Sequence, residues 1–293
     1  MKKLIVIAGA TASGKTDLAI QIARHFETEI LSADSRQCYI EMNIGVAKPS
    51  PEQLNEIPHH FINSHSILEE VSAGKYERYG LNVLEKIFSK KDMAVCVGGT
   101  GMYIKALCEG IDEMPATDPL IQAEVEENYK QYGIAWLQQE IEKTDPNFFS
   151  KGEIDNPARL QRALAFSLTT GKSILEFQQN MIKERPFKII KYAIDIEREI
   201  LYKRINQRVD EMINDGLIDE VKGLIQYKNL KSLNTVGYAE LFNYVDGNSS
   251  LEESISKIKQ HTRNYAKRQI TWFKNQSDFR WMSSEDILDE LTP

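Results

Sequence analysis

The 293-residue chain has only three cysteines, Cys38, Cys96 and Cys108, and none stands in a Cys-x-x-Cys arrangement. An odd number of widely spaced cysteines excludes a disulfide scaffold and disfavours a metal site, so we expect reduced thiols in a cytoplasmic protein. No apolar run approaches the ~20 residues that a membrane-spanning helix needs. The apolar run after Met1 ends at Gly9 without a cleavage pattern, so no signal peptide is expected.

The chain also lacks an excess of positive charge. Its 36 basic and 43 acidic residues give a net charge of −7, which excludes a uniformly basic coat for binding nucleic acid. A basic stripe on one part of the surface is compatible with this net charge, because affinity for phosphate depends on where the charges lie. With 42% hydrophobic residues, the composition is that of a globular protein with a substantial core.

Short apolar runs alternate with amphipathic helical patterns along the first 110 residues. Strands buried on both faces are predicted at 4–8, 29–33 and 93–97, and helices at 16–25, 73–90 and 101–109. This alternation predicts a doubly wound α/β sheet. The pattern of residues 112–185 predicts a mainly helical insertion. We therefore expect the core to comprise residues 1–111 and 186–293. In its second part we expect a strand at 188–196 and helices at 198–213, 217–227, 238–244 and 251–272.

Residues 9–16 match the phosphate-binding pattern G-x-x-x-x-G-K-[ST] between a predicted strand and a predicted helix. The segment consists of Gly9, Ala10, Thr11, Ala12, Ser13, Gly14, Lys15 and Thr16. Backbone amides and the helix N-terminus favour an anion, Lys15 adds a full charge, and the Thr16 hydroxyl can ligate Mg²⁺. The pattern predicts a nucleotide- or polyphosphate-binding loop with magnesium and leaves the reaction open.

Asp34 follows the second predicted strand, and ligands of open α/β sheets lie at the carboxyl ends of strands. We therefore expect Asp34 close to Lys15 and Thr16. Three roles stay open for this carboxylate: a general base, a partner of the magnesium shell, or the cap of the next helix.

A second glycine-rich segment, 97–103, follows the third predicted strand and does not match the dinucleotide pattern G-x-G-x-x-G. Its glycines suit either close approach to a ligand or tight packing of a helix on a strand. Thr100 suits a ligand contact or a helix cap.

Residues 254–276 contain no acid and carry six basic residues with three aromatic residues among them. This asymmetry suits an RNA-binding surface, and it equally suits a solvated terminal helix whose aromatic rings pack on the core. Arg204 and Arg208 are four residues apart, so they share a helix face and can bind one anion or pair with Glu197 or Asp210. The histidines at 59, 60 and 65 have no metal-ligand spacing and are predicted to lie in a loop or at a sheet edge.

Several longer motifs are more specific than the phosphate loop. They are GATASGKT (9–16), DSRQCY (34–39), IGVAKP (44–49), IPHHF (57–61), VGGTGMYIKAL (97–107), DNPARLQRAL (155–164), LYKRINQRV (201–209), TVGYAE (235–240) and TRNYAKRQITWF (262–273). Together they resemble the bacterial tRNA dimethylallyltransferase family over nearly the whole chain.

The resemblance implies a core like that of P-loop NTPases, with an insertion that binds the tRNA anticodon stem-loop. It implies a monomeric enzyme that transfers a dimethylallyl group from dimethylallyl diphosphate to the adenosine N6 next to the anticodon. Thr11–Thr16 would bind the diphosphate, Thr16 the Mg²⁺ cofactor, and Arg204 or Arg208 the pyrophosphate oxygens. Asp34 would be the general base. The tRNA-binding residues would be Asp34, Ser35, Arg36, Gln37, Thr100, Ala158, Arg159, Leu160, Gln161, Arg162, Asn234, Thr235, Val236, Gly237, Tyr238 and Ala239.

The chain departs from the family pattern at three alanines. Ala10 replaces a usual proline, and Ala158 and Ala239 stand where a basic residue is common. Two missing charges would lower the salt slope of tRNA binding by up to ~2. The alternatives are an adenylate isopentenyltransferase acting on free nucleotides, a P-loop small-molecule kinase, and a non-catalytic RNA-binding module.

Overall fold

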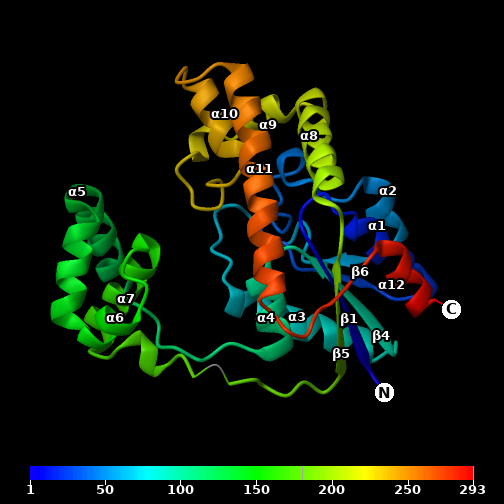
Figure 1. Cartoon of the computed structure of the whole chain (residues 1–293), viewed down its shortest axis with the longest axis horizontal. Helices are drawn as coiled ribbons and strands as arrows, with labels where there is room; N and C mark the ends of the chain where they lie inside the picture. The colour runs from blue at the N-terminus through cyan, green and yellow to red at the C-terminus, as the bar shows by residue number, and fades with distance from the viewer. Residues whose placement is uncertain (180, 293) are drawn as a thin grey trace. The chain divides into compact units, whose positions relative to one another are not determined.

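The protein divides into two compact units in a computed structural model that describes residues 1–179 and 181–292 (Figure 1). Unit 1 comprises Met1–Glu109 and Glu184–Pro293, and unit 2 comprises Gly110–Lys183. The sequence predicts the insertion at 112–185, so each observed boundary lies slightly earlier in the chain.

Unit 1 is built on a parallel sheet of six strands in the order β3-β2-β4-β1-β5-β6 (Figure 1). The strands are β1 (Lys3–Ala8), β2 (Ile30–Ser32), β3 (His59–His60), β4 (Met93–Gly98), β5 (Lys188–Ile194) and β6 (Arg280–Met282). The parallel α/β core is therefore confirmed, and β1, β2, β4 and β5 coincide with predicted strands. The edge strands β3 and β6 are too short to produce a hydrophobic period.

Both faces of the sheet are covered, because successive strand residues point to opposite sides. Ile5 and Ile7 of β1 pack with α1 (Lys15–His25) and α12 (Ser284–Leu291). Leu4 and Val6 belong to the larger cluster on the other face, with α3 (Ala73–Phe88) and α4 (Gly101–Glu109). This two-sided burial explains the continuous apolar runs of the strands.

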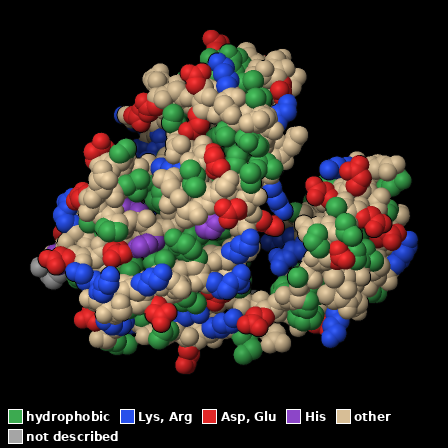
Figure 2. Space-filling model, turned by 180° about the vertical axis from the view of Figure 1, so that it is seen from behind, with side chains coloured by type: hydrophobic (Ala, Val, Ile, Leu, Met, Phe, Trp, Pro, Cys, Tyr) green, Lys and Arg blue, Asp and Glu red, His purple; other side chains and the backbone are tan. Residues whose placement is uncertain are grey.

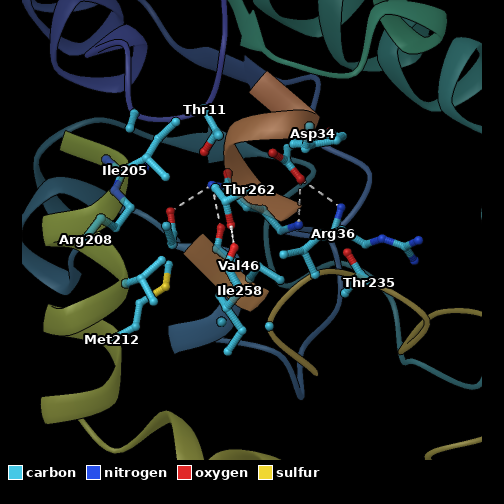
Figure 3. A pocket seen from close by; sticks show the side chains of 18 of the residues that line it. Thr11, Asp34, Arg36, Val46, Ile205, Arg208, Met212, Thr235, Ile258 and Thr262 are labelled. Atoms are coloured by element: carbon cyan, nitrogen blue, oxygen red, sulfur yellow. Dashed lines mark hydrogen bonds between the residues drawn. The ribbon is translucent and has the colours of Figure 1, made fainter. Parts of the chain in front are cut away.

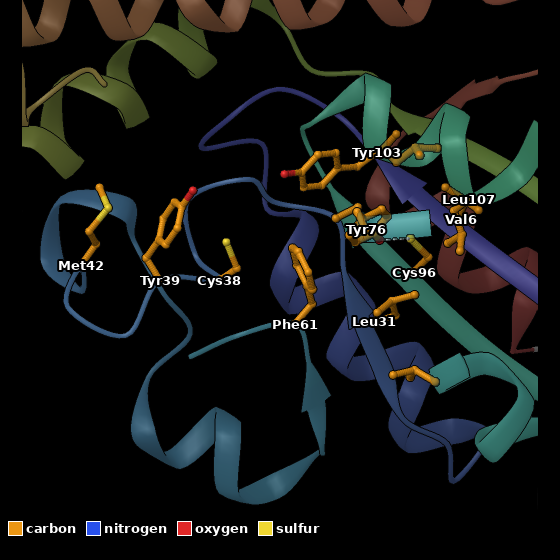
Figure 4. Close-up of a cluster of buried hydrophobic side chains, with 14 of the residues drawn as sticks. Val6, Leu31, Cys38, Tyr39, Met42, Phe61, Tyr76, Cys96, Tyr103 and Leu107 are labelled. Carbon is orange, nitrogen blue, oxygen red and sulfur yellow. Dashed lines mark hydrogen bonds between the residues drawn. The ribbon is translucent and has the colours of Figure 1, made fainter. Parts of the chain in front are cut away.

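An aromatic group belongs to the larger cluster (Figure 4). The rings of Tyr76 and Tyr103 stack with centroids 4.4 Å apart, and Phe61 meets Tyr76 edge-on at 4.7 Å. These contacts join α3 and α4 to the chain that follows β3. They fix the loops beside the carboxyl ends of β2 and β4.

The remaining helices of unit 1 lie between β2 and β3 and between β5 and β6 in the chain. They are η1 (Ile44–Val46), α2 (Pro51–Glu56), α8 (Arg198–Asn214), α9 (Leu217–Gly223), η3 (Ile225–Tyr227), α10 (Tyr238–Val245) and α11 (Leu251–Lys274). The helices predicted after residue 198 are confirmed. The sequence analysis does not predict α2 or α12. Lys259 pairs with Asp210, and Arg263 donates to Asn206 Oδ1 at 2.7 Å, so these two of the basic side chains of α11 contact α8.

Unit 2 is helical throughout its regular structure, as predicted. Its elements are α5 (Pro119–Thr144), α6 (Pro146–Lys151), α7 (Pro157–Thr170) and η2 (Ile174–Glu176). Gly133 interrupts α5 with φ of 74°, a left-handed value that favours glycine. Leu160 is fully buried in the core of this unit, so its side chain cannot contact RNA. The predicted tRNA contact is corrected for this residue.

On the face seen in Figure 2, acidic and basic side chains are interspersed and form no coat of one sign. Over the part of the chain that the structure describes, no helix combines the length and the apolar character needed to cross a membrane.

Replacing Leu160 by alanine should destabilise unit 2 by about 2–5 kcal/mol, because it leaves a cavity in a closed core. Denaturant unfolding of the full chain measures this change. Leu168→Ala on the same helix is the control, since 49% of Leu168 is exposed. Equal effects of the two substitutions would contradict the assignment of Leu160 to the core.

Candidate functional site

A cavity of about 870 Å³ lies in unit 1 at the carboxyl edge of the sheet (Figure 3). Its walls come from the phosphate loop, residues 34–37, residues 45–49, α8, residues 234–240 and α11. In Figure 3 the α8 side chains Ile205, Arg208 and Met212 lie across from Asp34, Arg36 and Thr235. The cavity thus unites segments that are distant in the sequence.

The phosphate loop has the strained geometry of an anion cradle. Gly14, the N-cap of α1, has φ of 92°, and Ala12 has φ of 63°. A left-handed non-glycine residue costs of order 1–3 kcal/mol and is retained where the surrounding structure requires it. The Lys15 ammonium donates to the Ala10 carbonyl at 2.8 Å, which folds its side chain over the loop. The loop thus curves at the start of α1, and anion binding there stays a prediction.

Three positive side chains meet at this loop. Burial lowers the pKa of the Lys15 ammonium to about 8; the charge of Asp34 opposes this shift and that of Arg208 adds to it. Burial also lowers the pKa of Arg208, which lies in the cavity wall. A Cβ on Gly14 would lie 3.8 Å from Arg204 Nη1, so Arg204 lies beside the loop. Asp210 pairs with Lys259, and the charges of Glu211 and Asp17 act on Arg208, so anion binding by the two arginines stays a prediction.

Asp34 lies in the cavity wall and also stabilises a local turn. Its Oδ1 accepts hydrogen bonds from the N–H groups of Arg36 at 2.8 Å and Gln37 at 3.2 Å. The capping role is thus present, on a turn rather than a helix. Since both bonds use Oδ1, the second carboxylate oxygen can serve another role. The charge of Asp34 acts on Lys15 and Tyr265, as expected for a carboxylate near the phosphate loop.

The residues after Asp34 line the cavity with side chains that also make protein contacts. Arg36 Nη1 donates to the Ser232 carbonyl at 2.8 Å, and Gln37 Nε2 donates to the Ala47 carbonyl at 2.9 Å. Thr100 Oγ1 accepts from the Ser35 N–H at 3.0 Å and donates to Ser35 Oγ at 3.3 Å. Ser35, Arg36, Gln37 and Thr100 therefore shape the loop around Asp34.

The second glycine-rich segment is explained by packing. A Cβ on Gly98 would overlap the Ala33 carbonyl, and one on Gly101 would overlap the Trp272 ring of α11. These glycines allow β2 and α11 to approach the end of β4 closely. Gly98 also lines the cavity, so the close packing forms part of its wall.

One wall of the cavity is apolar, which the sequence analysis does not predict. It consists of Val46, Ile205, Val209, Met212 and Ile258. Three of these side chains and Arg208 recur on one face of α8 at the i, i+3, i+4, i+7 spacing of an amphipathic helix. That spacing in the sequence could have revealed the wall, because it puts Arg208 on the same face as the apolar residues.

The basic C-terminal segment divides between two roles. Lys257 and Arg268 line the cavity, whereas Lys259 and Arg263 bind α8. Tyr265 also lines the cavity, and burial, with a further contribution from Asp34, raises the pKa of its hydroxyl to about 12. Lys259 and Arg263 thus make contacts within the protein, and RNA binding by the other basic residues of the segment stays a prediction.

The predicted tRNA-binding segment at 234–239 is largely in the cavity wall. The lining residues are Asn234, Thr235, Val236, Gly237 and Ala239. Glu240 fixes this segment: its carboxylate accepts from the Gly237 N–H at 2.7 Å and contacts His261 Nδ1 at 2.5 Å. Tyr238 is fully buried and donates to Glu220, so its side chain is unavailable to RNA and the prediction is corrected.

The other predicted tRNA-binding segment lies at the start of α7 in unit 2. Ala158, Arg159 and Arg162 are exposed, and Gln161 is half-buried. Arg159 forms an ion pair with Glu153, and Arg162 contacts the Met114 sulfur at 3.6 Å. This segment stays a predicted RNA contact.

His59 is a cavity residue with an unsatisfied nitrogen. It lies on β3 at the sheet edge, as predicted, and its Nδ1 contacts the Ile57 carbonyl at 2.7 Å. That contact leaves Nε2 as the acceptor nitrogen of the neutral ring, and this atom is buried without a partner in the described residues. Burial also lowers the pKa of His59, which favours the neutral ring. His59 lines the cavity, so a buried hydrogen-bond acceptor without a partner lies beside it.

Raising the pH from about 7 to about 9 should weaken the binding of inorganic pyrophosphate by up to about 10-fold relative to Lys15→Arg. The ammonium of Lys15 loses its proton near pH 8, whereas arginine stays charged. Calorimetric titration of both proteins measures the ratio, from which ionisation of the ligand cancels. A ratio that does not change with pH would contradict a role for the Lys15 charge.

Residues 37–276 match the model of the IPP transferase family. A tRNA dimethylallyltransferase of Christiangramia forsetii is 45% identical over 292 residues, covering 98% of this chain and 97% of the relative. A tRNA dimethylallyltransferase of Bacteroides thetaiotaomicron is 41% identical, with coverage of 99% and 96%.

Solved structures agree with these relatives. The crystal structure of a tRNA isopentenylpyrophosphate transferase from Bacillus halodurans has a TM-score of 0.74 and 31% identity, covering 99% of this chain and 95% of that one. A eukaryotic dimethylallyltransferase acting on tRNA has a TM-score of 0.76 and 26% identity, with coverage of 98% and 75%. The phosphate loop, the carboxylate beside it and this likeness over nearly the full length lead to one conclusion: the chain belongs to the IPP transferase family.

Proposed function

We propose that this protein transfers a dimethylallyl group from dimethylallyl diphosphate to N6 of the adenosine on the 3′ side of the anticodon in tRNA, releasing diphosphate. One observation carries the proposal: a single cavity contains a phosphate loop, a carboxylate and an apolar wall. The functions named for the relatives agree with it. The reaction would be that of a monomer in the cytoplasm, where tRNA is modified.

The donor fits the two kinds of surface in the cavity. Its diphosphate would bind residues 11–16 together with Lys15, Arg204 and Arg208, through N–H groups other than that of Thr11, which donates to Gln269 Oε1. Its five-carbon tail would contact the apolar wall formed by Val46, Met212 and their neighbours. A phosphoryl acceptor of a small-molecule kinase would not need this wall.

Magnesium fits the oxygen donors beside the phosphate loop. The Thr16 hydroxyl and the Asp34 carboxylate both line the cavity, and Mg²⁺ prefers oxygen ligands while keeping several waters. The buried, unpartnered His59 Nε2 suits a hydrogen bond from such a water. When bound, the ion would stabilise negative charge on the diphosphate.

The chemistry follows from the charges around the cavity. The bond between the allylic C1 and the diphosphate oxygen breaks, and its electron pair leaves with the diphosphate. Lys15 and Arg208 stabilise the charge that grows on the leaving group. N6 of the adenosine forms the new bond to C1, and its proton passes to the carboxylate of Asp34.

The acceptor base must leave its stack to reach Asp34, at a cost of a few kcal/mol. Tyr265 offers a ring face in the cavity, and its raised pKa keeps the hydroxyl neutral at physiological pH. Lys257 and Arg268 supply positive charge to the same cavity as segment 234–239, where RNA phosphates would bind. Residues 158–162 of unit 2 would contact the anticodon stem-loop.

Incubating the protein with unmodified tRNA, Mg²⁺ and dimethylallyl diphosphate tests the proposal. Mass spectrometry of the nucleosides should show a five-carbon unit on adenosine, in tRNA and not in free AMP. Modification of AMP alone would establish the free-nucleotide alternative. Phosphate transfer from ATP to a small acceptor, without prenylation, would establish the kinase.

Asp34→Asn should lower turnover by ~10²–10⁴-fold and leave tRNA affinity nearly unchanged, because the amide cannot take the N6 proton. The substitution keeps Oδ1 as the acceptor for the N–H groups of Arg36 and Gln37, so the turn is preserved. Single-turnover kinetics and tRNA binding are the measurements. The control is Asp92→Asn at the ion pair with Lys2. Near-normal turnover in Asp34→Asn would remove Asp34 from the role of base.

Ala239→Arg should steepen the salt dependence of tRNA binding by ~1 in the slope of log affinity against log salt. Ala239 lines the cavity at a position where the resemblance leads us to expect a basic residue. Ala239→Gln has comparable bulk without charge and should leave the slope unchanged. If both variants alter the slope equally, charge at this position is not what binds phosphate.

A further inference from the structure

The side-chain amide of Gln269 joins the phosphate loop to the second glycine-rich segment. Its Oε1 accepts a hydrogen bond of 2.8 Å from the Thr11 N–H, and its Nε2 donates one of 2.9 Å to the Gly99 carbonyl. Gln269 is only 6% exposed, so both bonds are shielded from water. Displacing either partner would leave a buried polar group unpaired, and the amide therefore fixes both.

The hydrogen bonds continue from this segment to the neighbours of Asp34. The Thr100 N–H donates to the Ala33 carbonyl at 3.1 Å, and Thr100 Oγ1 accepts from the Ser35 N–H at 3.0 Å. Ala33 and Ser35 flank Asp34 in the sequence. A connected set of polar contacts thus runs from the phosphate loop to both sides of the carboxylate.

Close packing leaves this connection little freedom. A Cβ on Gly99 would overlap Gln269 Nε2, and one on Gly101 would overlap the Trp272 ring. Gln269 and Trp272 are three residues apart on α11, so one face of this helix is seated on residues 99–101. The spacing between the two loops is therefore set by a rigid element.

We propose that Gln269 is a positioning residue that aligns the diphosphate on residues 9–16 with the base at Asp34. The inference rests on the proposed prenyl transfer. It adds the residue that positions the prenyl donor relative to the acceptor base. Misplacement of reacting groups by about 1 Å costs roughly 10²-fold in rate. Each substrate keeps its own contacts when Gln269 is changed, so the loss of activity should appear as a lower kcat.

Gln269→Met keeps the length of the side chain and removes both hydrogen bonds. With unmodified tRNA and dimethylallyl diphosphate, kcat should fall by about 10–100-fold while both KM values change by less than about 3-fold. The matched control is Gln276→Met, just after α11, where Nε2 donates only to the Trp272 carbonyl at 3.4 Å. A kcat within about 2-fold of the unmodified protein, or a change confined to KM, would overturn the proposal.

Gln269→Glu is a second variant, which tests the proposal if Gln269→Met folds poorly. Its carboxylate still accepts from the Thr11 N–H but cannot donate to the Gly99 carbonyl, so kcat should fall here too.

Combining Gln269→Met with Thr100→Val tests the connection to Ser35. The double variant should lose little more than Thr100→Val alone, because both act through residues 99–100. Multiplicative losses in kcat would show that Gln269 and Thr100 act independently, which would overturn the connection between them.

Amide hydrogen exchange provides a readout that does not depend on the reaction. The Ser35 N–H keeps its acceptor in Gln269→Met, so faster exchange there would show that the connection reaches the Asp34 loop. Unchanged exchange at Ser35 would overturn the connection. If the unmodified protein leaves tRNA unprenylated, the proposed function fails, and the exchange result still decides whether Gln269 couples the two loops.

Discussion

Positive charge gathered at one short loop is the feature on which the rest of this structure depends. Lys15, Arg204 and Arg208 meet there in a protein whose net charge is −7, and burial moves the pKa of Lys15 and of Arg208 toward the neutral form. Such a cluster is unfavourable until an anion neutralises it. In the proposed reaction the same residues would bind the diphosphate and stabilise it as the leaving group, and the Asp34 carboxylate lies in the same cavity.

The fold places these groups together through close packing at one edge of the sheet. Parallel strands bring the phosphate loop, Asp34 and Gly98 to the same side, because each follows the carboxyl end of a strand. Helix α11 then lies against residues 99–101, where a Cβ on Gly99 would collide with Gln269 and one on Gly101 with Trp272. The apolar wall and the basic residues of the cavity follow from α8 and α11 facing the same space.

The sequence predicts those parts of the site that are local. The phosphate loop and Asp34 could be placed because each directly follows a buried strand, and the parallel core follows from apolar runs that need no distant partner. Long-range contacts could not be predicted: Thr11 and Gln269 are 258 residues apart, and no periodicity links them. Motif membership also says nothing about which way a side chain points. Leu160 and Tyr238 stand inside motifs associated with RNA and are nevertheless fully buried.

The most direct measurement is a crystal structure of the protein with a non-reactive analogue of dimethylallyl diphosphate. The account predicts the diphosphate oxygens on N–H groups of residues 12–16 and on Lys15, with C1 facing Asp34 and the tail against Val46 and Met212. A tail directed away from Asp34, or an analogue bound outside this cavity, would contradict the central claim that the loop binds a group that leaves from carbon.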